Sequence, residues 1–321
     1  MTDQQHRCQS AQEAVLERWP LPVERIELAS EFGTTVVTAC GPRDGEPLVL
    51  QHGGSTTSAV WFANAAGLGR TRRLYAVDRI GEAGFSRPGP RPLRTPADLV
   101  EWLDGVFDGL SLSAPDLLGH SYGGAIALSY ALNRPQRVGR LVLLDPTQCF
   151  AGFRAGYLLH ALPMLLRPTA ARAQRFLAWE TGGLELDPAW VELYGRAAEF
   201  PRGRFVVPHR PSPPQLANCQ TPTLILLAAQ SRAHDSRTVQ TAAARLLPHA
   251  ETALLPPALP GRTAGQPADR GVPGQASPVE SGVSRSRKRR KSPELTQTPT
   301  TRQTIVSPRS AGGRRLKDGT R

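Results

Sequence analysis

The pentapeptide Gly-His-Ser-Tyr-Gly at residues 119–123 constrains the fold of this chain more than any other segment. It follows a short apolar strand-like run and precedes a segment of small and apolar residues, 122–135, with a helical pattern. A serine between two glycines at such a junction is typical of a sharp turn that presents its hydroxyl at the sheet edge. Gly119 and Gly123 suit this turn because larger side chains would clash across it. The alternative is an ordinary strand–helix turn in which Ser121 only caps the helix.

Apolar strand segments alternate with helical segments along most of the chain. Strands are predicted at residues 23–30, 33–41, 47–54, 72–79, 116–121, 140–146, 221–229 and 251–256, and helices at 96–110, 122–135 and 235–247. The first two strands are close enough to form a hairpin, and strands joined by helices form parallel sheets. We therefore predict an α/β fold with a mostly parallel sheet of about eight strands.

The alternation is interrupted by residues 147–218, which have helical patterns and follow the carboxyl end of a predicted strand. Ligands bind at the carboxyl ends of the strands in such sheets. We therefore predict a helical insertion that borders the site. The predicted segments are an N-terminal helical or flexible segment at 1–22, a core formed by 23–146 and 219–256, the insertion at 147–218, and a tail at 257–321.

The positive charge of the chain is concentrated in its last 65 residues. Residues 257–321 hold 14 Lys and Arg against 4 Asp and Glu, whereas residues 1–256 hold 25 against 23. No aromatic residue follows Phe205, so the composition predicts a disordered basic tail from residue 257. The run SRSRKRRK at 284–291 fits a nuclear import signal or a nucleic-acid patch, but without aromatic residues a solvated tail is the simpler interpretation. We expect no specific nucleic-acid partner.

Cysteine usage and the N-terminal sequence indicate a cytoplasmic protein. The cysteines are widely spaced and include no C-x-x-C pair; they are Cys8, Cys40, Cys149 and Cys219. This spacing fits reduced cysteines better than a disulfide framework. The first residues lack the apolar core of a signal peptide, and no run approaches about 20 apolar residues. We therefore expect no membrane partner, and the sequence does not define an oligomeric state.

Several segments, in this order, resemble the α/β-hydrolase family over residues 23–256. They are LVLQHGG, YAVDRIGEAGFSRPG, GHSYGG, RLVLLDP and TPTLILLAA. The resemblance implies that Ser121 is a nucleophile and that the backbone N–H groups of Gly54 and Tyr122 form an oxyanion hole. It also implies that the insertion is a cap that shapes the pocket for a small-molecule substrate. We expect no cofactor and no metal.

A serine nucleophile requires a histidine base and an acid that orients the base. The usual acid position in the family falls near Ser231 and Arg232, and neither residue is acidic. Asp235 lies slightly later and is equally placed to cap the following helix. Asp145, at the end of the predicted strand 140–146, is the second candidate because some relatives use that strand for their acid. The sequence leaves the acid open between Asp145 and Asp235.

The histidine base has no counterpart at the position that the family uses, which is after the last strand. No histidine follows His249, and His249 itself precedes that strand. His52 suits a structural role in its turn, while the side chain of His120 points away from its neighbour Ser121. The remaining candidates within the fold are His160, His209 and His234, and His6 lies outside it. The base is therefore unknown from the sequence.

The missing base coincides with the change in composition after Pro256, and this leads to a hypothesis about the tail. A shifted reading frame in a gene rich in Arg, Pro, Gly and Ala codons would replace the histidine loop with such a tail. For the function, the sequence leaves two hypotheses: a working esterase-like serine hydrolase for an uncharged or apolar acyl substrate, or a catalytically impaired protein of the same fold. Apolar side chains of the insertion suggest the apolar substrate; they are Phe150, Phe153, Tyr157, Leu158, Leu159, Trp179 and Trp190.

Overall fold

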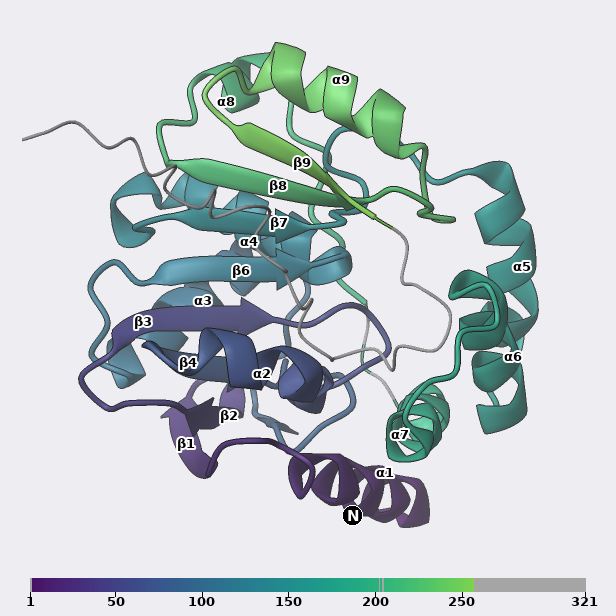
Figure 1. Cartoon of the computed structure of the whole chain (residues 1–321). Coiled ribbons are helices and arrows are strands. Elements are labelled where there is room, and N and C mark those ends of the chain that lie inside the picture. The colour runs from purple at the N-terminus through teal and green to yellow at the C-terminus, as the bar shows by residue number, and fades with distance from the viewer. Residues whose placement is uncertain (1, 202, 204, 257–321) are drawn as a thin grey trace, which may run out of the picture. The chain divides into compact units, whose positions relative to one another are not determined.

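The fold is a strongly twisted sheet between two layers of helices, as the computed structural model in Figure 1 shows. It describes residues 2–201, 203 and 205–256, so the tail predicted from residue 257 lies outside the described residues. The strands are β1 (Glu24–Ser30), β2 (Gly33–Cys40), β3 (Glu46–Gln51), β4 (Arg72–Val77), β5 (Arg87–Pro88), β6 (Asp116–His120), β7 (Leu141–Leu144), β8 (Thr223–Ala228) and β9 (Glu251–Leu255). The helices are α1 (Asp3–Leu16), α2 (Phe62–Leu68), α3 (Pro96–Gly109), α4 (Tyr122–Asn133), α5 (Ala155–Leu166), α6 (Ala170–Glu180), α7 (Pro188–Glu199), α8 (Pro213–Ala217) and α9 (Ser236–Leu246), with 3₁₀ turns at Ser58–Trp61 and Pro135–Arg137.

The described strands form one sheet in the order β1-β2-β4-β3-β6-β7-β8-β9, with β5 paired to β2. β1 and β2 form the predicted hairpin, in which Ser30 lies opposite Gly33. β2 is antiparallel to β4, and the neighbours from β4 to β9 are parallel. The structure confirms the predicted α/β fold with its mostly parallel sheet. It adds the two-residue strand β5 and the helix α2, which the sequence analysis did not predict.

The two faces of the sheet are buried by different helices because successive strand residues point to opposite sides. In β3, Val49 belongs to the core cluster that includes residues of α3, α4 and α9. Its neighbours Leu48 and Leu50 belong to the cluster that includes residues of α1, α2 and α7. Each central strand is therefore apolar on both faces, which explains the continuous apolar runs in the sequence.

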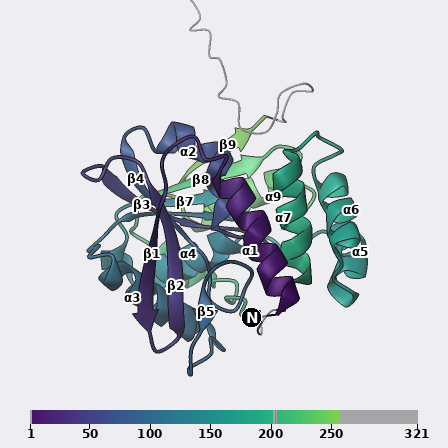
Figure 2. The same ribbon diagram turned by 90° about the horizontal axis from the view of Figure 1, so that it is seen from below.

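Residues near the N-terminus form a helix that packs on the fold. α1 begins with a capping box at Thr2, and its side chains Cys8 and Val15 are buried. Gln12, also buried, donates a hydrogen bond of 2.9 Å to the Asp78 carboxylate. Figures 1 and 2 both show α1 alongside α7, and the two helices are in contact. α1 is thus tied both to the sheet and to the helices inserted after β7.

The helices α5 to α8 lie between β7 and β8 in the chain, within the insertion expected at 147–218. Figure 1 shows α5, α6 and α7 beside the carboxyl ends of the central strands. They share a separate apolar cluster that includes Met164, Phe176, Leu177 and Tyr194. The inserted helices therefore have a small core of their own. Within the described residues, no helix combines the length and the apolar character that crossing a membrane requires.

Candidate active site

Ser121 occupies a strained turn between β6 and α4. Its φ of 52° and ψ of −116° are unusual for a residue other than glycine. A Cβ atom on Gly119 would lie 2.2 Å from the Gly123 carbonyl oxygen, and one on Gly123 would lie 2.4 Å from the Gln51 carbonyl oxygen. The Ser121 side chain makes no capping hydrogen bond to α4. Its geometry therefore matches the sharp turn rather than the alternative of a helix cap.

The close approach around this turn predicts that Gly123→Ala destabilises the protein by about 1–3 kcal/mol or more, since backbone atoms cannot move aside cheaply. Gly67→Ala is the matched control: Gly67 is an exposed glycine of α2 with nothing within 4 Å of the added Cβ. Alanine there should stabilise the helix by about 0.5–1 kcal/mol. Urea unfolding at 25 °C measures both changes. Equal stability of the two variants would contradict the tight packing of the turn.

The loop that follows β3 lies against the turn of Ser121. A Cβ atom on Gly53 would lie 3.6 Å from the Ser121 Cβ, and one on Gly54 would lie 3.9 Å from the Tyr122 Cβ. Tyr122 is the first residue of α4, so its N–H belongs to the first helical turn, where backbone donors have no partner within the helix. The structure thus brings both predicted oxyanion-hole residues beside Ser121.

Arg79, a residue to which the sequence analysis gave no role, holds this loop. Its side chain is only 1% exposed. It donates hydrogen bonds of 2.6 Å to the His52 carbonyl oxygen and 2.7 Å to the Gly53 carbonyl oxygen. Its Nε also donates to the Glu82 carboxylate at 2.7 Å, which compensates the buried positive charge. Arg79 and Glu82 both lie in the segment YAVDRIGEAGFSRPG. Their spacing of three residues is the sequence feature that could have indicated this ion pair.

The hydrogen bond to Gly53 also constrains Gly54. The Gly53 carbonyl and the Gly54 N–H belong to one planar trans peptide, so they point in opposite directions. A charged donor on the carbonyl fixes the direction of the N–H and strengthens it as a donor. The Arg79 guanidinium also lies 4.9 Å from the ring centroid of Tyr122, the residue that would supply the second N–H. Arg79 therefore contacts both sides of the candidate oxyanion hole.

Asp145 follows β7 with a φ of 44° and lines a cavity together with Ser121. Its carboxylate accepts hydrogen bonds from Ser231 Oγ at 2.8 Å and from the Ala228 N–H at 3.1 Å. His234 Nε2 lies 3.2 Å from Asp145 Oδ1. Burial alone would raise the pKa of Asp145, but the contacts with His234, Ser231 and Ala228 outweigh burial and lower it. Asp145 is therefore held as a carboxylate at the edge of the cavity.

Asp235, the other candidate acid, caps α9. Its carboxylate accepts a hydrogen bond of 2.7 Å from the Thr238 N–H and forms an ion pair with Arg154 at 3.0 Å. Asp235 lines a different cavity, which does not include Ser121. The structure therefore brings Asp145, and not Asp235, into the cavity of the candidate nucleophile.

The described histidines differ in their relation to Ser121. His52 is fully buried in its turn, and burial together with the charge of Arg79 lowers its pKa well below the usual value. His120 lines the cavity of Ser121, and burial lowers its pKa. His234 contacts Asp145 but lines the cavity of Asp235. The exposed histidines are His6, His160, His209 and His249. Within residues 2–201, 203 and 205–256, none of the histidines forms a hydrogen bond with Ser121.

Two cavities meet at Ser121, and both are also lined by Gly54, Tyr157 and Tyr194. The apolar cavity, of about 240 Å³, has mostly aromatic and aliphatic walls; they include Ala125, Phe153, Leu158, Ala161, Met164, Leu165, Phe176, Phe205 and Val207. The polar cavity, of about 360 Å³, has more polar walls; they include Thr56, His120, Asp145, Glu180, Thr181, Gln230, Ser231 and Arg232.

The apolar residues expected to face the substrate are distributed unevenly. Those that line one or both cavities are Phe153, Tyr157, Leu158 and Trp190. Phe150 is buried in the main core, Leu159 is exposed, and Trp179 stacks on His160. Helical patterns predict where apolar residues lie along a helix, but the tertiary packing of the insertion decides which of them reach the cavity.

Glu180 adds a titratable group to the polar cavity. Burial raises its pKa to about 7, although a hydrogen bond of 3.2 Å from the Tyr157 hydroxyl opposes the shift. The carboxyl group is therefore partly protonated near neutral pH and can donate or accept a hydrogen bond. No local sequence pattern marks Glu180, because its placement in the cavity depends on long-range packing.

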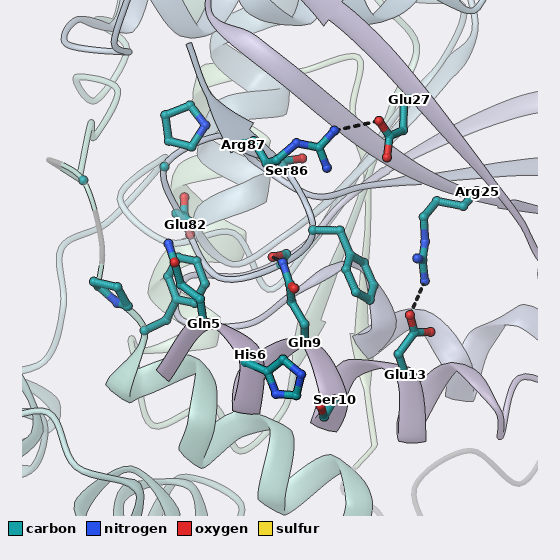
Figure 3. Close-up of a pocket in the computed structure, with 17 residues that line it drawn as sticks. Gln5, His6, Gln9, Ser10, Glu13, Arg25, Glu27, Glu82, Ser86 and Arg87 are labelled. Carbon is teal, nitrogen blue, oxygen red and sulfur yellow. Dashed lines mark hydrogen bonds and ion pairs between the residues drawn. The ribbon is translucent and has the colours of Figure 1, made fainter. Parts of the chain in front are cut away.

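A larger cavity of about 690 Å³ lies between α1, β1 and the segment around β5, and it contains neither Ser121 nor Asp145. Figure 3 shows two ion pairs among the side chains that line it. Arg25 contacts Glu13 at 2.8 Å, and Arg87 contacts Glu27 at 2.7 Å. In the part of the chain that the structure describes, no group of three or more His, Cys, Asp or Glu residues is placed to hold a metal ion.

The chain belongs to the α/β-hydrolase family, because the family model for the alpha/beta hydrolase fold matches residues 46–259. It is 36% identical to carboxylesterase YbfK of Bacillus subtilis (strain 168) over 177 residues, which are 55% of this chain and 58% of that protein. The match to YbfK thus spans less than two thirds of its length. The chain is also 29% identical to the uncharacterized carboxylesterase nap of the same organism over 249 residues, which are 75% of this chain and 81% of that protein.

Among solved structures, the naproxen esterase (carboxylesterase NP) from Bacillus subtilis matches with a TM-score of 0.74 and 27% identity. The match covers 80% of this chain and 91% of that chain. These similarities show that homologues of the chain are carboxylesterases of the α/β-hydrolase fold.

Proposed function

We propose that the protein is a serine esterase in which Ser121 forms a covalent acyl intermediate. The observation that carries the proposal is the position of Ser121, which stands in a strained turn where two cavities meet, beside Gly54, Tyr122 and Asp145. The carboxylesterase homologues support ester hydrolysis as the reaction. The proposed substrate is a small uncharged or apolar acyl ester.

In the proposed reaction, Ser121 Oγ attacks the ester carbonyl carbon while a base accepts its proton. The N–H groups of Gly54 and Tyr122 stabilise the negative oxygen of the tetrahedral intermediate. The intermediate then expels the alcohol, which takes up the proton, and leaves an acyl-serine. Water hydrolyses the acyl-serine through a second tetrahedral intermediate and releases the carboxylic acid. Asp145 is the proposed acid because its carboxylate is ionised and faces the same cavity.

Arg79 is a positioning residue in this proposal, since it acts on the reaction through the Gly53–Gly54 peptide. The two cavities give the substrate a direction: the apolar cavity suits the acyl chain, and the polar cavity suits the alcohol and the water that replaces it. All four cysteines are free and buried, and burial raises the pKa of Cys8 and Cys149 to about 12. Free, buried thiols fit a reducing compartment, and we propose the cytoplasm.

A second candidate function is a hydrolase fold with impaired catalysis. It is favoured by one observation, that no histidine among the described residues is hydrogen-bonded to Ser121. Loss of the base leaves only the residual rate that the oxyanion hole and substrate binding provide.

Labelling with a fluorophosphonate probe separates the two functions, because the probe reacts with activated serines. We expect one probe per chain, located on Ser121 by peptide mass spectrometry, and no labelling of Ser121→Ala. Absence of labelling in the full chain, under conditions that label a serine esterase completely, would instead support the impaired form.

A further inference from the structure

Helix α5 is apolar on two sides, and one of these sides is exposed. Ala161 and Met164 are buried against the other inserted helices. Five leucines of α5 are between 45% and 72% exposed; these are Leu158, Leu159, Leu162, Leu165 and Leu166, here called the α5 face. At 3.6 residues per turn they fall within an arc of about 120°. A contiguous apolar surface of this kind on a folded protein usually marks an interaction site.

The α5 face is continuous with the cavity of the candidate nucleophile. Leu158 and Leu165 belong to the face and also line the apolar cavity that contains Ser121. Phe205 and Val207, which are 41% and 45% exposed, line the same cavity. The exposed apolar surface therefore meets the cavity at Leu158 and Leu165, and an acyl chain can pass from one to the other while remaining in apolar surroundings.

The segment that carries the face is basic. Residues 146–179 contain no Asp or Glu and four arginines, namely Arg154, Arg167, Arg172 and Arg175. Arg154 pairs with Asp235. Arg167 directly follows the last leucine of the face, and neither Arg167 nor Arg175 pairs with an acidic side chain among the described residues. Both side chains are exposed. An apolar face that ends at Arg167, in a segment without acidic residues, fits an anionic surface that also accepts apolar side chains.

We propose that the α5 face docks on an anionic lipid surface, from which the ester substrate enters the apolar cavity. Leucines that insert among lipid chains lose contact with water, while arginines stay at the anionic headgroups. A second copy of the chain fits the face less well, because its own segment 146–179 is equally basic and offers Arg167 no acidic side chain. The proposal rests on the proposed function for the delivery of substrate, and it names lipid-soluble acyl esters as the substrate class. It revises the expectation that no membrane is a partner.

The experiment measures binding of the full chain to vesicles of phosphatidylcholine, alone or mixed equally with phosphatidylglycerol. We expect binding to the mixed vesicles that weakens in high salt. Leu159→Gln/Leu166→Gln should weaken it about 10- to 100-fold, because two of the most exposed apolar side chains are replaced. Neither leucine lines a cavity, so hydrolysis of a soluble short-chain ester should stay within about twofold of the unmodified chain.

The matched control is Val23→Gln/Leu254→Gln, which replaces two apolar side chains, each 40% exposed, outside the α5 face. This control should bind vesicles like the unmodified chain. The basic tail is present in every variant, so equal binding by the α5 double variant would assign the binding to the tail and overturn the proposal. The proposal is also wrong if the face mediates a dimer that the double variant abolishes, with no vesicle binding. Ser121→Ala should bind vesicles normally, which separates docking from the proposed function.

Discussion

Replacing Ser121 with alanine should lower kcat/KM for a p-nitrophenyl acyl ester by at least about 10³-fold. The serine oxygen is the only atom removed, so substrate binding should persist while the acyl intermediate cannot form. The fluorophosphonate probe should also fail to react. Steady-state hydrolysis of a short-chain ester measures the change, provided that the variant shows an unchanged melting temperature.

Ser129→Ala is the matched control because Ser129 lies two turns further along α4 and lines neither cavity. It should hydrolyse the ester at the rate of the unmodified chain. Activity that survives in Ser121→Ala would assign the chemistry to another residue. A full chain whose own rate is already near that of Ser121→Ala would support the impaired form.

Arg79→Met should lower kcat by about 10²- to 10³-fold, while KM changes by less than about threefold. A decrease of this size in kcat is typical of the loss of one oxyanion-hole donor. The reason is that the Gly54 N–H acts on the negative oxygen of the tetrahedral intermediate more than on the neutral ester. Without the guanidinium, the Gly53 carbonyl keeps its contact of 2.7 Å with His52 Nδ1 but loses the charged donor that orients the peptide. Steady-state kinetics on the same ester separates kcat from KM.

A control variant shows whether Arg79→Met lowers kcat through the oxyanion hole or only by destabilising the fold. Arg73→Met is the matched control, because Arg73 is also buried and donates to the Gly41 carbonyl oxygen, at a position outside both cavities. It should destabilise the protein to a similar extent without lowering kcat of the folded fraction. Arg79→Lys should recover part of the activity, since an ammonium can reach one carbonyl but not both. Equal kinetic effects of Arg73→Met and Arg79→Met would contradict a positioning role.

Most of the strands and helices and the turn of Ser121 could be predicted because they depend on local patterns; the short elements β5 and α2 could not. The apolar run before Gly119 and the small residues after it specify a strand, a turn and a helix within about 20 residues. The choice between Asp145 and Asp235 could not be made in the same way. It depends on the Ser231 hydroxyl and the Ala228 N–H, which approach Asp145 only when β8 pairs with β7.

The cavities and the role of Arg79 could not be predicted for a similar reason, because both depend on contacts between segments that are distant in the chain. The role of Arg79 becomes visible only when β3 and β4 pair and bring its side chain under the Gly53–Gly54 peptide. The walls of the cavities come from helices that are distant in the chain from Ser121. Sequence periodicity marks their apolar positions, but it does not tell which leucines of α5 are buried and which form the exposed face.

The insertion of α5 to α8 between two neighbouring strands has a consequence for how such a protein diversifies. Ser121, Gly54 and Asp145 stand on strand ends whose positions are fixed by the hydrogen bonds of the sheet. Helices α5 and α6 pack, with part of α7, around a cluster of their own, and the insertion as a whole supplies most of the residues that line the apolar cavity. Natural selection can therefore exchange or reshape this module, and with it the accepted substrate, while the inherited reaction chemistry is preserved.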